Sequence, residues 1–145
     1  IEWPVVVMLA AMIPVGQALE TSGISLNIAN FISASTEGMA LPWIILMVLV
    51  ITMFVSDIVN NAATAVIMAP IAANLAIQVG QPVEPFLMAV AVGASCAFLS
   101  PIGHQCNTLV MAPGNYKFGD YWRLGLPLEC VIVAISIPMI LFVWT

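Results

Sequence analysis

The stretch Ser56-Asp57-Ile58-Val59-Asn60-Asn61-Ala62-Ala63-Thr64 interrupts a long apolar passage with a cluster of polar side chains. A second stretch, Ser100-Pro101-Ile102-Gly103-His104-Gln105-Cys106-Asn107-Thr108, interrupts the next apolar passage in the same way. Polar groups at bilayer depth are tolerated only where protein buries them or a water-filled cavity receives them. Paired interruptions of hydrophobic segments are typical of the binding site of a membrane transporter.

The composition indicates a membrane protein. Hydrophobic residues make up 63% of the chain and charged residues 6%, whereas a soluble domain carries about a quarter charged residues. Residues 126–144 are apolar apart from Glu129 and Ser136, and this run is close to the ~20 residues that span a bilayer. We therefore expect lipid around the protein and no nucleic-acid partner.

The turn-forming residues divide the chain into five predicted elements. These are a helix over about 1–20, a short surface helix over 24–34, a re-entrant hairpin over 41–79, an unwound helix over 86–112 and a last transmembrane helix over 125–145. The predicted fold class is an all-α integral membrane protein. Because the chain begins at Ile1 rather than Met, and a partner repeat is missing, we interpret residues 1–145 as the C-terminal part of a membrane transport domain, a fragment of a longer chain.

The hairpin prediction depends on helix length. The apolar run Leu41–Val55 has 15 residues, which as a helix extend roughly 22 Å and fall short of the ~30 Å hydrocarbon core. A re-entrant hairpin with a polar tip is one reading, and two ordinary spans joined by an aqueous turn are the alternative. The run Phe86–Leu99 is also short, and Pro101 stops it, so we expect a span with an unwound middle.

The orientation follows from the two basic residues. Lys117 and Arg123 both lie before the last helix, and the positive-inside rule places that loop in the cytoplasm. Glu129, near the cytoplasmic end of the last helix, is expected to reach the headgroup level.

The polar tip predicts a site for a cation and an anion together. The helix that ends near Ser56 leaves carbonyl groups unpaired, which suit Na⁺, and the helix that begins near Asn60 and Asn61 leaves N–H groups unpaired, which suit an anion. The unwound residues 101–107 supply opposing groups. Because no Lys or Arg lies near either break, we expect a small oxyanion held by dipoles and bound Na⁺, such as sulfate or a short dicarboxylate.

The residues also resemble a known family. Residues 56–65, followed by Met68-Ala69-Pro70, resemble the second hairpin of the divalent anion:sodium symporters, and residues 94–107 resemble the unwound helix that follows it there. Residues 112–127 resemble the loop into that family's last helix. The resemblance implies the C-terminal half of a sulfate-type permease with two inverted repeats, a multi-pass protein of the bacterial inner membrane that forms a homodimer.

The resemblance also implies roles for individual residues. Asn61 matches a residue that contacts both sodium and anion, Ser56 matches a sodium-binding serine, and the Val59 carbonyl and Gly103 fall where backbone sodium ligands lie. The family's tip reads Ser-Asn-Thr, so Ala62 lacks a hydroxyl that the family has. The predicted substrate-binding residues are Asn60, Asn61, Ala62, Thr64, His104 and Asn107. The predicted sodium ligands are Ser56, Val59, Asn61 and Gly103, with Na⁺ as coupling ion, no other cofactor and no catalytic residue.

Simpler roles remain open for several of these residues. Asp57 is a sodium counter-charge, a proton relay or a helix cap. His104 titrates with transport, contacts substrate or bonds to unwound backbone, and Thr64 either binds substrate or packs between helices. A carrier of other specificity, such as an arsenite or proton-coupled antiporter, is the main alternative function. A channel or a structural membrane subunit is the next alternative. A membrane-embedded hydrolase is not supported, because the sequence has no glycine-flanked nucleophile turn.

Overall fold

The computed structural model describes residues 3–36 and 38–144, and every regular element in this part of the chain is helical. The elements are α1 (Trp3–Thr21), α2 (Ile24–Ser35), α3 (Leu41–Ile58), α4 (Asn61–Gln78), α5 (Glu84–Ala94), α6 (Gln105–Met111), the 3₁₀ turn η1 (Phe118–Asp120) and α7 (Tyr121–Trp144). The predicted all-helical class is confirmed.

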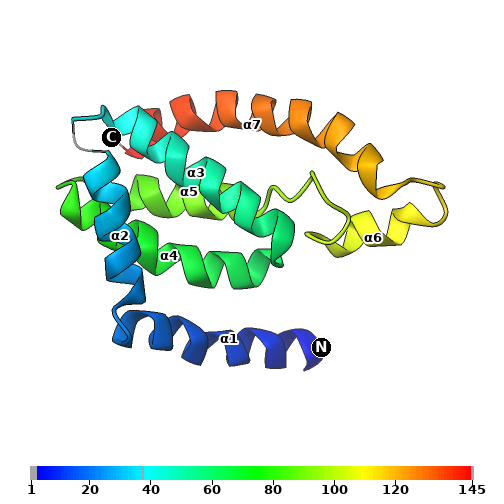
Figure 1. Cartoon of the computed structure of the whole chain (residues 1–145), viewed down its shortest axis with the longest axis horizontal. Coiled ribbons are helices and arrows are strands. Elements are labelled where there is room, and N and C mark those ends of the chain that lie inside the picture. Colours follow the sequence, from blue (N-terminus) through cyan, green and yellow to red (C-terminus); the bar gives the residue numbers. More distant parts are fainter. Residues whose placement is uncertain (1–2, 37, 145) are drawn as a thin grey trace.

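Figure 1 shows α7 along one side of the molecule and α1 along the opposite side, with α3, α4 and α5 between them. Helix α2 runs at a steep angle to the others and packs against α4 and α1. Helix α7 packs on α3 and α5, and α1 packs on α4. The middle three helices therefore carry the core, and the outer helices present most of their surface outward.

The core lies where α3, α4 and α5 meet. Its fully buried members include Ile45, Leu49, Leu75 and Phe86. Helices α3 and α5 approach each other closely at Gly93, where an added Cβ would lie 2.8 Å from Thr52 Cβ. Small residues at helix contacts permit such approach in membranes, where van der Waals packing drives helix association.

Within residues 3–36 and 38–144, three segments are long and apolar enough to cross a membrane by length and composition: α3, α4, and the stretch from η1 through α7. Helix α3 has 18 residues and continues to Ile58, three residues beyond the apolar run. At 1.5 Å per residue its length is about 27 Å. The argument that this helix is too short to span was therefore wrong, and length alone leaves both readings of the α3–α4 pair open.

The second break begins earlier than the sequence indicates. Helix α5 ends at Ala94 rather than near Leu99, and residues 95–104 form no regular helix before α6 starts. We refer to residues 95–104 as the irregular segment. It lies between the end of α3 and the first turns of α7. Its Leu99 N–H bonds to Asp57 on α3, and its Phe98 backbone contacts α7.

Candidate binding site at the ends of α3 and α4

The site is built where α3 ends, α4 begins and the chain leaves α5. Ser56, in the last turn of α3, is fully buried. Its hydroxyl oxygen lies 2.8 Å from the Ala94 carbonyl oxygen and 3.0 Å from Asn61 Oδ1. A hydroxyl has one proton, so it can donate to only one of these two oxygens at a time. Three oxygen atoms thus gather around a single proton.

Asp57 joins α3 to the irregular segment. Its Oδ1 accepts the Leu99 N–H at 3.0 Å, and its backbone carbonyl accepts the Ser100 hydroxyl at 2.6 Å. The side chain is only 7% exposed, and its Oδ2 has no hydrogen-bond partner among the described residues. Of the two roles that the sequence left open, the contacts favour a structural one, although Asp57 fixes the irregular segment rather than its own helix.

Gly103 lies directly against the end of α3. An added Cβ there would lie 2.6 Å from Ala97 Cβ and 2.8 Å from the Ser56 carbonyl oxygen. The Ser100 hydroxyl oxygen accepts the Gly103 N–H at 3.2 Å and holds this residue in place. The structure therefore brings Ser56 and Asn61, two of the predicted sodium-binding residues, together with the Ala94 carbonyl, and it places Gly103 against the backbone at the end of α3.

The start of α4 presents backbone N–H groups. Asn60 is its N-cap, and Asn60 Oδ1 accepts the Ala63 N–H at 2.8 Å. This amide oxygen satisfies one of the unpaired donors at the helix start, so only the amide NH₂ group of Asn60 remains for a ligand. Ala62 has a small side chain, so it adds little bulk beside these N–H groups.

Thr64, also predicted to bind substrate, is fully buried one turn into α4. Its hydroxyl has no partner in the part of the chain that the structure describes. These contacts do not distinguish the two roles of Thr64, substrate binding and packing between helices. The Val59 carbonyl, predicted as a backbone ligand, belongs to an extended residue in the turn between α3 and α4.

His104 and Asn107 lie at the far edge of the irregular segment. His104 is exposed and caps α6, because its Nδ1 accepts the Cys106 N–H at 3.2 Å. The Asn107 amide donates to the carbonyl oxygens of Ala97 at 2.9 Å and Ser100 at 3.1 Å. Asn107 therefore ties α6 to the irregular segment, and neither His104 nor Asn107 hydrogen-bonds to the Ser56 side chain.

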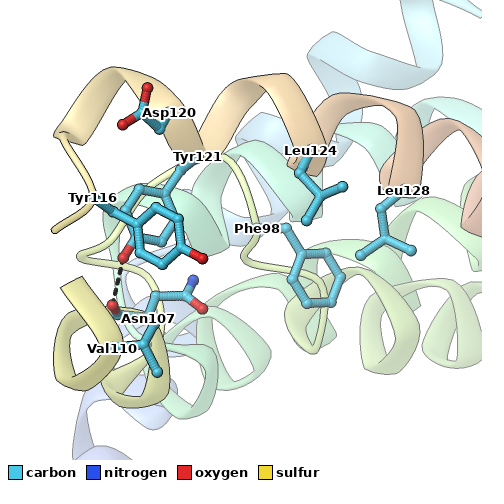
Figure 2. A pocket seen from close by; sticks show the side chains of 9 residues that line it. Phe98, Asn107, Val110, Tyr116, Asp120, Tyr121, Leu124 and Leu128 are labelled. Carbon is cyan, nitrogen blue, oxygen red and sulfur yellow. Dashed lines mark hydrogen bonds between the residues drawn. The ribbon is translucent and has the colours of Figure 1, made fainter. Parts of the chain in front are cut away.

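A pocket with a volume of about 280 Å³ opens on the other side of Asn107, between α6 and the start of α7. Figure 2 shows Tyr116, Tyr121 and Asp120 at one end of this pocket and Phe98, Leu124 and Leu128 at the other. Tyr121 donates its hydroxyl proton to the Asn107 carbonyl oxygen at 2.6 Å. Since Asn107 alone of the predicted site residues lines it, this pocket is distinct from the cluster at the helix ends.

Two features of the site were not predicted from the sequence. The Ala94 carbonyl belongs to an apolar residue, so no side chain marks it. Glu129 was expected at the headgroup level, but its Oε1 is buried without a partner among the described residues, and its carboxyl lies against the Phe98 N–H. The described residues also hold no group of three or more His, Cys, Asp or Glu residues suited to a transition metal.

Comparison with known proteins identifies the family. Residues 1–93 match the family described as "CitMHS: Citrate transporter". The chain belongs to the citrate transporter family. It is therefore part of a membrane transporter and not an enzyme, as the polar breaks indicated.

Three relatives show which members of this family the chain is similar to. The chain is 38% identical over 144 residues to the uncharacterized transporter YfbS of Escherichia coli, across 97% of this chain and 23% of that protein. It is 32% identical over 141 residues to the probable sodium/sulfate cotransporter 3 of Chlamydomonas reinhardtii, across 94% and 15%.

It is also 32% identical over 136 residues to the sodium-dependent high-affinity dicarboxylate transporter 3 of Caenorhabditis elegans, across 92% of this chain and 24% of that protein. These names confirm the resemblance to the divalent anion:sodium symporters. The chain spans less than a quarter of each relative's length.

Proposed function

We propose that this chain forms part of a transporter that couples the uptake of a small divalent anion to sodium. The observation that carries the proposal is the cluster of Ser56 Oγ, Asn61 Oδ1 and the Ala94 carbonyl oxygen, with one hydroxyl proton among them. Hard cations in proteins take oxygen ligands from side chains and backbone carbonyls. All three oxygens could coordinate a sodium ion here at once, and Gly103, which lies against the Ser56 backbone carbonyl, is the proposed further ligand from the irregular segment.

The anion is proposed to bind at the start of α4, beside the sodium ion. The helix N-terminus offers N–H groups and the positive end of the helix dipole. Asn60 contributes its NH₂ group, while Lys117 and Arg123, the two basic residues of the chain, lie outside this cluster. Without a fixed positive charge, the bound sodium supplies the charge that balances the anion. Sulfate is the first candidate and a short dicarboxylate the second.

We further propose that α3 and α4 form a re-entrant hairpin and that α5, the irregular segment and α6 form one broken span. Ser56 and Asp57 in the last turn of α3 and Thr64 in the first turn of α4 are buried by protein, while Asn60 between the helices is exposed, and the tip lies against the irregular segment. A turn in water does not require such coverage, whereas a tip inside the bilayer does. The full protein is proposed to be a homodimer in a bacterial inner membrane, as the family resemblance implies.

The proposed sodium site is tested by Asn61→Ala in the full-length protein reconstituted in vesicles. The substitution removes one proposed ligand oxygen, so the sodium concentration for half-maximal uptake should rise by at least about tenfold, the scale of effects measured at metal sites. Asn74→Ala, which removes an amide elsewhere on α4, is the matched control and should leave this concentration unchanged. Wild-type sodium dependence in Asn61→Ala would refute the site.

The same assay separates the alternatives. A proton-coupled or arsenite carrier would move its substrate without a sodium gradient, and a channel would conduct with no gradient-driven accumulation. If uptake depends on sodium and the anion accumulates against its own gradient, the result supports the symporter alone.

A further inference from the structure

Two consecutive peptide groups of the irregular segment meet carboxyl groups from two different helices. The Leu99 N–H donates to Asp57 Oδ1 on α3 at 3.0 Å. The preceding N–H, that of Phe98, faces the Glu129 carboxyl on α7. Because the two carboxyls come from different helices, they can hold this short segment between α3 and α7.

The backbone of α7 is close enough for this contact because of Gly125. An added Cβ at Gly125 would lie 2.5 Å from the Phe98 carbonyl oxygen and 3.2 Å from the Leu99 nitrogen. Glu129 follows four residues later, and residues i and i+4 lie on the same face of a helix. Helix α7 thus meets the Phe98 peptide through two residues, a glycine that permits the approach and a carboxyl that receives the N–H.

The two carboxyl groups are not explained by packing. Asp57 Oδ2 and Glu129 Oε1 are both buried without a hydrogen-bond partner among the described residues. Burying a carboxyl that is incompletely paired is unfavourable, and a hydrophobic residue of similar size would fill such a position at no electrostatic penalty. A role in holding the backbone of residues 98 and 99 accounts for acidic residues at both positions.

We propose that Glu129 is a positioning residue for the site at the helix ends. Together with Asp57, it clamps the Phe98–Leu99 peptides so that Gly103 stays against the Ser56 carbonyl and the irregular segment keeps one wall of the sodium site in place. Glu129 itself contacts neither sodium nor anion. This inference rests on the proposed sodium-coupled function for its consequence in transport, while the clamp itself can be tested separately.

The clamp is tested by backbone hydrogen exchange of the full-length protein, read on peptides that cover residues 96–100. Glu129→Ala should exchange faster there than wild type, and Glu129→Gln, which keeps an acceptor oxygen, should restore slow exchange. Cys130→Ala, at an exposed neighbouring position on α7, is the control and should match wild type. Unchanged exchange at residues 96–100 in Glu129→Ala overturns the clamp.

A second variant covers the case in which Glu129→Ala does not fold. Gly125→Ala forces a Cβ toward the Phe98 carbonyl and should loosen the same peptide from the α7 side. Faster exchange confined to residues 96–100 supports the proposal, and exchange that rises equally throughout α3 and α5 contradicts it.

The consequence for transport is tested by sodium titration of uptake. Glu129→Ala should raise the half-saturating sodium concentration about tenfold, as loss of a group that orients a metal ligand does, with Glu129→Gln close to wild type. A residue needed only for folding would lower the maximal rate and leave that concentration unchanged, which would overturn the positioning role. If wild-type uptake is independent of sodium, the proposed function fails, and hydrogen exchange still decides the clamp.

Discussion

At the scale of single residues, the site depends on contacts that a methyl group would break. Gly103 approaches the Ser56 carbonyl so closely that an added Cβ would lie 2.8 Å from it and 2.6 Å from Ala97 Cβ. Both neighbours are backbone or Cβ atoms that cannot rotate away. The identity of residue 103 is therefore fixed by packing against α3, in addition to any role as a ligand.

Gly103→Ala should destabilise the full-length protein by about 1–3 kcal/mol, the usual effect of overpacking. The shift should be measurable as a lower melting temperature in detergent and as weaker sodium-dependent uptake. Gly119→Ala is the control, because an added Cβ there meets no atom within 4 Å. Equal melting temperatures for the two variants would contradict the close packing described for Gly103.

At the scale of elements, one side chain at the start of α4, that of Asn60, has two proposed roles. Asn60 caps the helix with its oxygen, while its NH₂ group is proposed to reach the anion. Substitutions can separate these roles because serine caps a helix as well as asparagine does but offers no amide.

Asn60→Ala should therefore lower the free energy of unfolding by about 0.5–2 kcal/mol, and Asn60→Ser should restore it. If the NH₂ group binds the anion, both variants should weaken the apparent affinity for the anion, which uptake at varied anion concentration measures. Restoration of both stability and affinity by Asn60→Ser would leave Asn60 with the capping role alone.

The elements also show what the sequence could and could not predict. The polar tip with Ser56 and Asn61 was predictable because polar side chains stand out in an apolar run, and their role as ligands stays a prediction. The early end of α5 and the burial of Glu129 Oε1 were not predictable, since both depend on contacts with residues more than 30 positions away. The length of α3 was misjudged for the same reason: Asp57 extends the helix only because Leu99 and Ser100 satisfy its polar groups.

At the scale of the whole molecule, the membrane topology decides between a re-entrant hairpin and two ordinary spans for α3 and α4. In a background without Cys96, Cys106 and Cys130, single cysteines at Gln81 and Gly119 should react with an impermeant thiol reagent from opposite sides. A cysteine at Ile58, beside the tip, should react from neither side if α3 and α4 are re-entrant. Reaction of Ile58→Cys from the same side as Gly119→Cys would establish two ordinary spans instead.

The whole molecule should also be stabilised by its substrate. With sodium present, sulfate or a succinate-like acid should raise the melting temperature of the full-length protein, because a ligand at a hundredfold excess over its Kd adds about 2.7 kcal/mol. The same anion without sodium should have little effect, since the proposed charge balance comes from the ion. A screen in which only neutral or cationic solutes stabilise the protein would contradict the anion proposal.

The contacts of the irregular segment also have a consequence for biogenesis. The N–H group that bonds to the Asp57 carboxylate belongs to a residue 42 positions further along the chain. At ribosomal rates of ~5–20 residues per second, that residue is synthesised about 2–8 s after Asp57. During that interval the α3–α4 tip carries unpaired polar groups and cannot rest stably in lipid. We expect the tip to stay hydrated or chaperoned until residue 99 emerges, so nascent chains stalled before that point should be targets for membrane quality control.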